Sequence, residues 1–189
     1  MFKHVSAAAL ILLLAAAPAL AGEPFVPIDS GKEIETKVAA LLKSRMKLNS
    51  ALQVVGEDAD NLRASTLFNA NAEAGTPRVM VLTDTLVLKR DADGKPTSQA
   101  IAISAIGDVK LKADEELKLL RWANIWNAKA LPVRIYIVSG KVVAATNMVM
   151  TRTVSVSEDE FLTAFLNTTQ IWALLIKDLE HAGLLADAQ

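Results

Sequence analysis

The stretch VRIYIVSGKVVAATNMVM, residues 133–150, decides the fold, because its pattern is that of two strands joined by a tight turn. In its first part, apolar side chains occupy every second position, which is typical of a strand with one buried face. We expect the buried face to carry Val133, Ile135 and Ile137, and the opposite face to carry Arg134 and Tyr136. Ser139 and Gly140 form a two-residue loop, where Gly tolerates the positive φ angle of a primed hairpin turn. Residues 141–150 then return as the antiparallel partner strand.

A long amphipathic helix follows this hairpin. Ser157 and Glu160 have the spacing of a capping box, in which the hydroxyl and the carboxylate each accept from a free backbone amide at the helix start. Apolar positions then recur at helical spacing on one stripe: Leu162, Phe165, Leu166, Thr169, Trp172, Ala173, Ile176 and Leu179. Gly183 is a suitable residue to end the helix. The pattern predicts about seven turns of helix packed against the sheet.

The chain before the hairpin predicts further elements of both kinds. The expected helices cover 32–48 and the residues from Asp114 to just before Pro132, and the expected strands cover 78–83, 85–90 and 100–106. Residues 61–71 fit either a helix or a strand, and both readings stay open. We therefore predict an α+β fold with an antiparallel sheet of about five strands flanked by helices, in the order α-β-β-β-α-β-β-α.

The N-terminal segment has the features of an export signal. Lys3 supplies the positive end, a mostly apolar run follows, and Ala19-Leu20-Ala21 is a small-x-small cleavage site. We expect a signal peptide over residues 1–21, a flexible lead over 22–31 and a single domain over 32–185. Cleavage removes Lys3 and changes the net charge from −1 to −2. This predicts a periplasmic protein, with an uncleaved membrane anchor as the alternative.

The composition excludes several classes of site. The chain has no Cys and two His, of which His4 lies in the export signal, so disulfide scaffolds, thiol catalysis and His/Cys zinc sites are not expected. A nucleic-acid-binding surface needs clustered basic residues and is not expected either. We expect no catalytic residue, no metal and no cofactor. Ser44 and Lys47 match S-x-x-K on the polar side of a helix, and Asp91 and Asp93 fit a turn better than a calcium loop.

Residues 120–179 resemble the YbjN-like family, described as candidate bacterial sensory transduction regulators. The resemblance is carried by Trp126-Asn127 at a helix end, the strand 133–137, the turn at Gly140, the strand 142–150 and the helix from Ser157. It implies a fold like that of type III secretion chaperones, in which a helix comes first, a sheet follows and a helix comes last. It also implies a role in protein interaction or regulation, and a homodimer as one form of assembly.

These observations lead us to predict a non-enzymatic periplasmic module that binds a protein or peptide partner. An antiparallel sheet covered on one face leaves its other face free for such a partner. The residues expected to contact it are Trp126, Arg134 and Tyr136. One alternative is a carrier that holds a small molecule or lipid in an apolar pocket between sheet and helices. Another is a hydrolase that uses Ser, Lys or carboxylate groups. We expect neither a nucleic acid partner nor stable membrane insertion after signal cleavage.

Overall fold

A six-stranded antiparallel sheet and three α-helices form the part of the chain that the computed structural model describes, residues 22–27, 31–58, 61–71, 77–129 and 132–186. The helices are α1 (Gly31–Met46), α2 (Glu116–Lys129) and α3 (Glu158–His181), with a 3₁₀ turn over Ala113–Glu115 before α2. The strands are β1 (Ser50–Val54), β2 (Leu62–Phe68), β3 (Val79–Arg90), β4 (Pro96–Gly107), β5 (Arg134–Val138) and β6 (Lys141–Thr151). The expected signal peptide lies outside the described residues.

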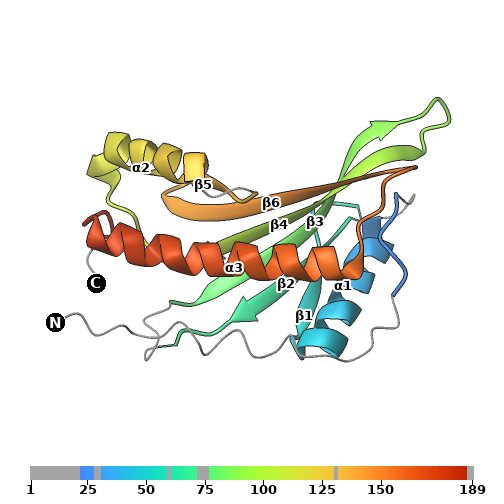
Figure 1. Cartoon of the computed structure of the whole chain (residues 1–189), viewed down its shortest axis with the longest axis horizontal. Coiled ribbons are helices and arrows are strands. Elements are labelled where there is room, and N and C mark those ends of the chain that lie inside the picture. Colours follow the sequence, from blue (N-terminus) through green and yellow to red (C-terminus); the bar gives the residue numbers. More distant parts are fainter. Residues whose placement is uncertain (1–21, 28–30, 59–60, 72–76, 130–131, 187–189) are drawn as a thin grey trace.

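The strands lie in the order β1-β2-β3-β4-β6-β5, so β1 and β5 are the edges of the sheet (Figure 1). The α+β class and the antiparallel sheet are confirmed, with six strands where about five were predicted. Strand β2 settles the alternative left open for residues 61–71, and β1 is added before it.

The prediction of two strands over 78–83 and 85–90 is wrong, because β3 runs through both. In the sequence, the polar triplet Thr83-Asp84-Thr85 resembles a break between two strands. In the structure, it lies inside one long strand. Thr83 is buried against the helices, whereas Asp84 lies on the other face, where its carboxylate accepts from Arg63 of β2 at 2.6 Å. The charged residue of the triplet, Asp84, is therefore paired without ending the strand.

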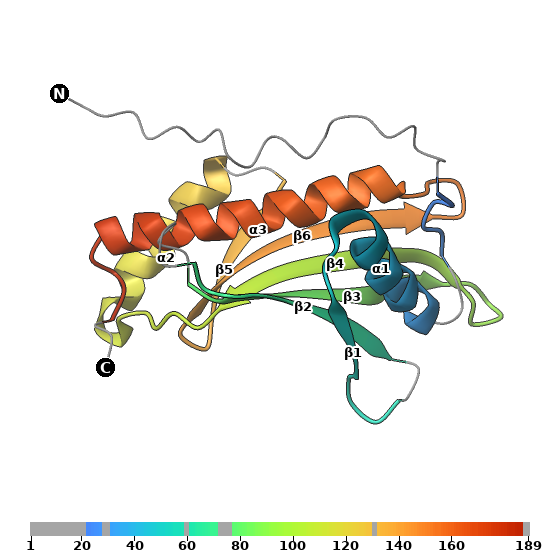
Figure 2. The same cartoon turned by 90° about the horizontal axis from the view of Figure 1, so that it is seen from below.

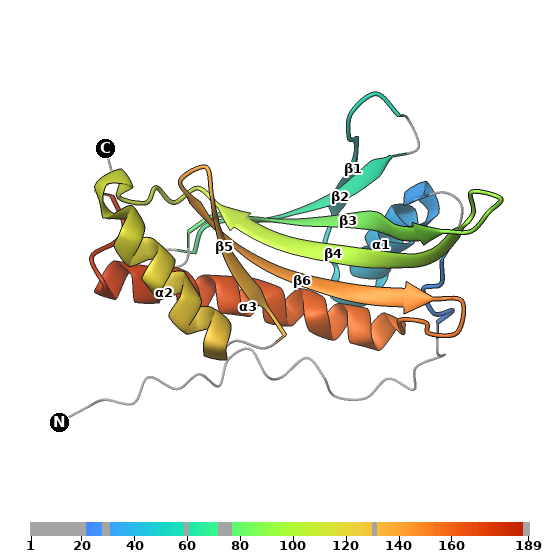
Figure 3. The same ribbon diagram turned by 90° about the horizontal axis from the view of Figure 1, so that it is seen from above.

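All three helices leave one face of the sheet open. Helix α1 contacts β1, β2 and β3, and α3 contacts β4 and β6, so both lie on the same face (Figure 2). Helix α2 packs along the edge strand β5. The opposite view shows the strands with no helix lying across them (Figure 3).

The core fills the space between this covered face and the helices. Its largest fully buried side chains on α3 are Phe161, Phe165 and Trp172. The Trp172 ring lies against Gly107 at the end of β4, where a Cβ atom would overlap the indole. Any larger residue at position 107 would hold α3 away from the sheet, so this close approach requires Gly.

The local features predicted around the β5–β6 hairpin and α3 are confirmed. Ser139 and Gly140 have φ angles of 49° and 72°, as a primed hairpin turn requires. The Ser157 hydroxyl accepts from the Glu160 amide at 3.2 Å, and the Glu160 carboxylate accepts from the Ser157 amide at 2.7 Å. Phe25, in the segment expected as a flexible lead, is buried against Phe161, with ring centroids 5.4 Å apart.

Candidate functional site

The open face of the sheet carries a row of apolar side chains that crosses five strands. Residues directly opposite each other in an antiparallel pair point to the same face, so the strand register defines the row. We call it the cross-strand row: Leu67, Met80, Ile106, Val143 and Tyr136, on β2, β3, β4, β6 and β5. Leu67, Met80 and Tyr136 are 41%, 39% and 48% exposed. The row is less accessible in its middle, where Val143 is 9% exposed. Exposed apolar side chains gathered on an open sheet face are typical of a protein-interaction surface.

Polar residues flank the cross-strand row. The next row of paired residues is mixed, with Ser65 on β2 and Ser104 on β4 among apolar neighbours. One row further, Arg63 and Asp84 form an ion pair at 2.6 Å with both side chains half-buried. An apolar centre beside a polar margin matches the anatomy of a protein–protein interface.

Two of the three residues expected to contact a partner lie on this open face. Tyr136 belongs to the cross-strand row, and Arg134 lies two residues before it on the same strand. Both side chains are exposed, whereas Ile135 between them is 2% exposed on the covered face. The Arg134 guanidinium donates to the Asn127 carbonyl at 3.1 Å, which directs it toward the end of α2.

Trp126, the third expected residue, points toward α3 instead. Its indole N–H donates to Asp178 Oδ2 at 2.7 Å, and the Trp122 indole donates to the same oxygen at 2.7 Å. The Trp126 hydrogen bond, followed by that of Trp122, holds the pKa of Asp178 below its ordinary value. This two-indole contact joins α2 to α3, so the structure does not bring Trp126 together with Arg134 and Tyr136.

The Asn127 side chain binds the backbone of β5 at its free edge. Its side-chain oxygen accepts from the Ile135 amide at 2.6 Å, and its side-chain nitrogen donates to the Ile135 carbonyl at 2.9 Å. The amide therefore replaces the missing neighbour strand at this position, which protects an edge from pairing with another chain. The backbone groups of Ile135 are therefore not available to another chain.

The alternative sites from the sequence do not form reactive arrangements. Lys47 donates to the Ser44 carbonyl oxygen at 3.0 Å, and the Ser44 hydroxyl donates to Leu41 O at 3.1 Å, so the S-x-x-K residues satisfy local backbone groups. Asp91 Oδ1 accepts from the amides of Lys95 and Asp93, as expected of a turn. In the ranges the structure describes, no three His, Cys, Asp or Glu residues gather as a metal site would require.

Two hollows of the described chain lie on its outside. One is at the ends of β3, β4 and β6, and the other lies along α1 and the turn after it. Neither lies between the sheet and the helices, where the carrier hypothesis places its pocket. None of the described helices combines the length and the apolar character that a membrane span needs.

Most of the cross-strand row could not be named from the sequence. Leu67 lies in the segment that fitted a helix or a strand, and Met80 gave only a period-two signal within its own strand. The row exists because β4 pairs with β6, which follows it only after a 3₁₀ turn, α2 and β5. Alternation within a strand predicts which residues share a face, but it does not predict the register between distant strands.

The resemblance to the YbjN fold is confirmed by a solved structure. YbjN from E. coli, described as a candidate transcription regulator, superimposes with a TM-score of 0.52 and 13% sequence identity. The match covers 80% of this chain and 95% of that one. No protein-family model and no curated protein sequence matches the chain. The shared property is therefore the fold.

Proposed function

We propose that this protein is a non-enzymatic regulatory or binding module that engages a protein partner through the open face of its sheet. The observation that carries the proposal is the cross-strand row, in which Leu67, Met80 and Tyr136 each leave about two-fifths or more of the side chain exposed. Burying such side chains contributes roughly 25 cal/mol per Å² of apolar surface. The YbjN-like fold supports this reading, because the YbjN protein is itself described as a candidate regulator.

The chemistry of the face favours a protein partner. Tyr and Arg are the residue types that most often dominate binding energy at interfaces, and Tyr136 and Arg134 lie two residues apart on one edge strand. The Asn127 contact with Ile135 blocks backbone pairing near the start of that edge. The partner is therefore expected to pack on side chains across the strands, rather than to extend the sheet.

Export to the periplasm is part of this proposal. It is supported by the charged start, the apolar run and the small-x-small site before Gly22. Subcellular fractionation and N-terminal sequencing of the protein test it. Recovery from the periplasm with Gly22 as the first residue supports export, and recovery of the chain with Met1 intact contradicts cleavage.

Site-specific photo-cross-linking in cells tests the binding face. A photoreactive amino acid is placed at Met80 or at Tyr136, and the control position is Leu174, which is 55% exposed on α3. The expected result is a discrete cross-linked product from both face positions and none from Leu174. Mass spectrometry then identifies the partner, and a product of two copies of this chain identifies a homodimer.

Equal cross-linking from all three positions, or none from the face positions, would contradict this assignment of the surface.

A further inference from the structure

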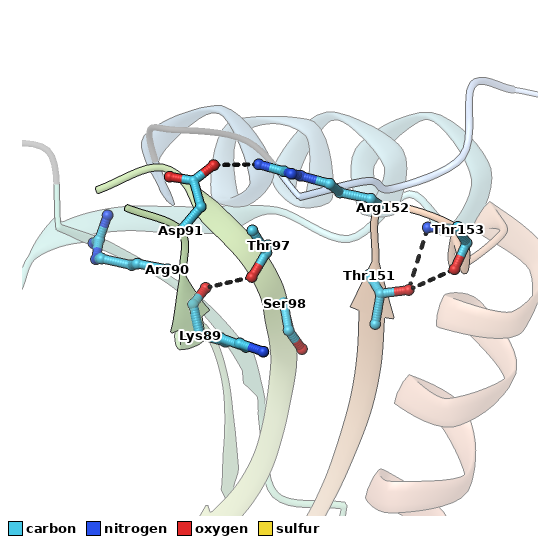
Figure 4. Close-up of a pocket in the computed structure, with 8 residues that line it drawn as sticks. All are labelled: Lys89, Arg90, Asp91, Thr97, Ser98, Thr151, Arg152 and Thr153. Atoms are coloured by element: carbon cyan, nitrogen blue, oxygen red, sulfur yellow. Dashed lines mark hydrogen bonds and ion pairs between the residues drawn. The ribbon is translucent and has the colours of Figure 1, made fainter. Parts of the chain in front are cut away.

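A second feature of the open face lies at its far end, beyond the cross-strand row. The turn between β3 and β4 approaches the loop after β6, and together they line an open hollow of about 530 Å³ (Figure 4). We call this the hairpin hollow; its lining includes Lys89, Asp91, Ser98, Thr151, Arg152 and Thr153. Its floor is a separate set of paired polar residues, in which Lys89 pairs with Ser98 and Ser98 pairs with Thr151. Its open, polar lining suits a small charged group rather than an apolar ligand.

The cationic groups of the hairpin hollow are incompletely paired. Within the described residues the Lys89 ammonium has no hydrogen-bond or ion-pair partner. Arg152 bonds the Asp91 carboxylate through Nη2, while its Nη1 and Nε have no partner in the described chain. Arg90 also lines the hollow, but its side chain is directed away from Ser98 and Arg152 (Figure 4), and its guanidinium donates to the Gly94 carbonyl at 2.7 Å.

The single carboxylate in the lining already accepts three hydrogen bonds. Asp91 Oδ1 accepts from the backbone amides of Lys95 and Asp93 at 2.9 and 3.1 Å, and Oδ2 accepts from Arg152. The Lys95 amide, first among these donors, holds the pKa of Asp91 below its ordinary value. Asp91 is thus fixed as an anion that orients Arg152, and little of its lone-pair capacity is left for a cation.

The hydroxyl groups are arranged to donate rather than to accept. Thr151 Oγ1 accepts from the amides of Val154 and Thr153 at 3.1 and 3.3 Å, so its lone pairs are used and its own proton is free to be donated. The Thr153 hydroxyl lies 3.3 Å from it and can take that proton, which leaves its own for a ligand. The Ser98 hydroxyl has no partner among the described groups.

We propose that the hairpin hollow binds the phosphate group of a phosphate ester, held by Lys89, Arg152 and the hydroxyls of Ser98 and Thr153. A guanidinium edge, an ammonium and several donating hydroxyls match a tetrahedral oxyanion. The hollow has room for an organic group besides the phosphate. The row next to its floor includes Leu86 and Val149, which are 47% and 50% exposed and provide an apolar surface beside the site. The ester is either soluble or a phospholipid headgroup.

The test is a titration of the purified protein with inorganic phosphate, followed by amide NMR shifts. Saturable shifts are expected at Lys89, Ser98 and Arg152. Lys89→Ala should weaken the apparent affinity at least about fivefold, because it removes a charge-assisted contact. The matched control is Lys43→Ala, an exposed lysine of the other hollow, which has no arginine in its lining. Asp91→Asn keeps an acceptor for the turn but frees Arg152, so it should tighten binding.

Flotation with phosphatidylglycerol vesicles, in the presence and absence of free phosphate, distinguishes the two sources. Flotation that phosphate competes away and that Lys89→Ala loses supports a lipid headgroup. Phosphate shifts at the hollow without flotation support a soluble ester. The absence of saturable shifts at the hollow, or equal weakening by Lys43→Ala and Lys89→Ala, would overturn the proposal. Neither result depends on whether a protein partner binds the cross-strand row.

Discussion

At the scale of single residues, Glu35 is the one ionisable side chain that is buried among the described residues. It lies on α1, is 1% exposed, and its Oε2 has no hydrogen-bond partner among the described groups. Burial raises the pKa of this carboxyl above its ordinary value of 4.5. The folded protein therefore holds a proton on Glu35 at a pH where the unfolded chain has already lost it.

The sign of the resulting pH dependence follows from proton binding. Between pH 4.5 and the raised pKa, the folded state binds more protons than the unfolded state, so the free energy of unfolding falls as the pH rises. Glu35→Gln removes this titration, and each unit of pKa shift corresponds to about 1.4 kcal/mol. We expect the variant to gain stability over the original protein as the pH rises from 4 to 8, measured by urea unfolding. Parallel pH profiles would show that Glu35 does not titrate in this way.

The pKa of Asp178 is lowered by hydrogen bonds, whereas the pKa of Glu35 is raised by burial. The indole N–H groups of Trp126 and Trp122 stabilise the charged form of Asp178. The carboxylate therefore contributes to the free energy of unfolding above its ordinary pKa of 3.8, and this contribution is lost as the pH falls below that value. Asp178→Asn should destabilise the protein at pH 7 by less than about 1 kcal/mol, because the carboxylate is largely solvated. The difference between the two proteins should shrink toward pH 3. Urea unfolding followed by tryptophan fluorescence measures it, and a difference that is constant with pH would contradict the assignment.

At the scale of elements, the end of α2 and the edge strand β5 depend on each other. Asn127 supplies both a donor and an acceptor to Ile135, in place of a neighbouring strand. Asn127→Ala should cost about 1–3 kcal/mol, because it leaves two half-buried backbone groups unpaired. It should also expose the strand edge and cause self-association that increases with protein concentration.

Urea unfolding and size-exclusion chromatography at increasing concentration check both effects. The matched control is Asn124→Ala, one turn earlier on the same helix, where the side chain is exposed. If both variants behave alike, Asn127 has no special role at the edge.

The elements also show what the sequence could and could not predict. The β5–β6 hairpin and α3 were predicted closely, because alternation, a primed turn and a capping box are local signals. The length of β3 was not predicted, because Asp84 pairs with Arg63, which lies 21 residues away in the sequence. Trp126 was placed on the correct helix, but its direction depends on Asp178 of α3, 52 residues later. Contacts of this kind are set by packing between distant segments, which periodicity within one segment does not reveal.

At the scale of the whole molecule, the two faces of the sheet separate stability from recognition. The covered face carries the core, where Ile135 is 2% exposed, and the open face carries Arg134 and Tyr136 on the same strand. Substitutions on one strand should therefore have different consequences according to the face that they alter. A chain without Cys can leave Leu67, Met80 and Tyr136 partly exposed, because the covered core supplies the stability.

The double variant Arg134→Ala/Tyr136→Ala tests this separation against Ile135→Ala. Arg134 loses only an exposed bond to the Asn127 carbonyl and Tyr136 is 48% exposed, so the double variant should keep its Tm within about 2 °C. Ile135→Ala should cost about 2–5 kcal/mol, because it opens a cavity in the core. Cross-linking from Met80 should fall about tenfold in the double variant, as the loss of an interface hot spot predicts. A Tm loss as large as that of Ile135→Ala would show that Arg134 and Tyr136 stabilise the sheet. That result would contradict the assignment of the open face as the binding surface.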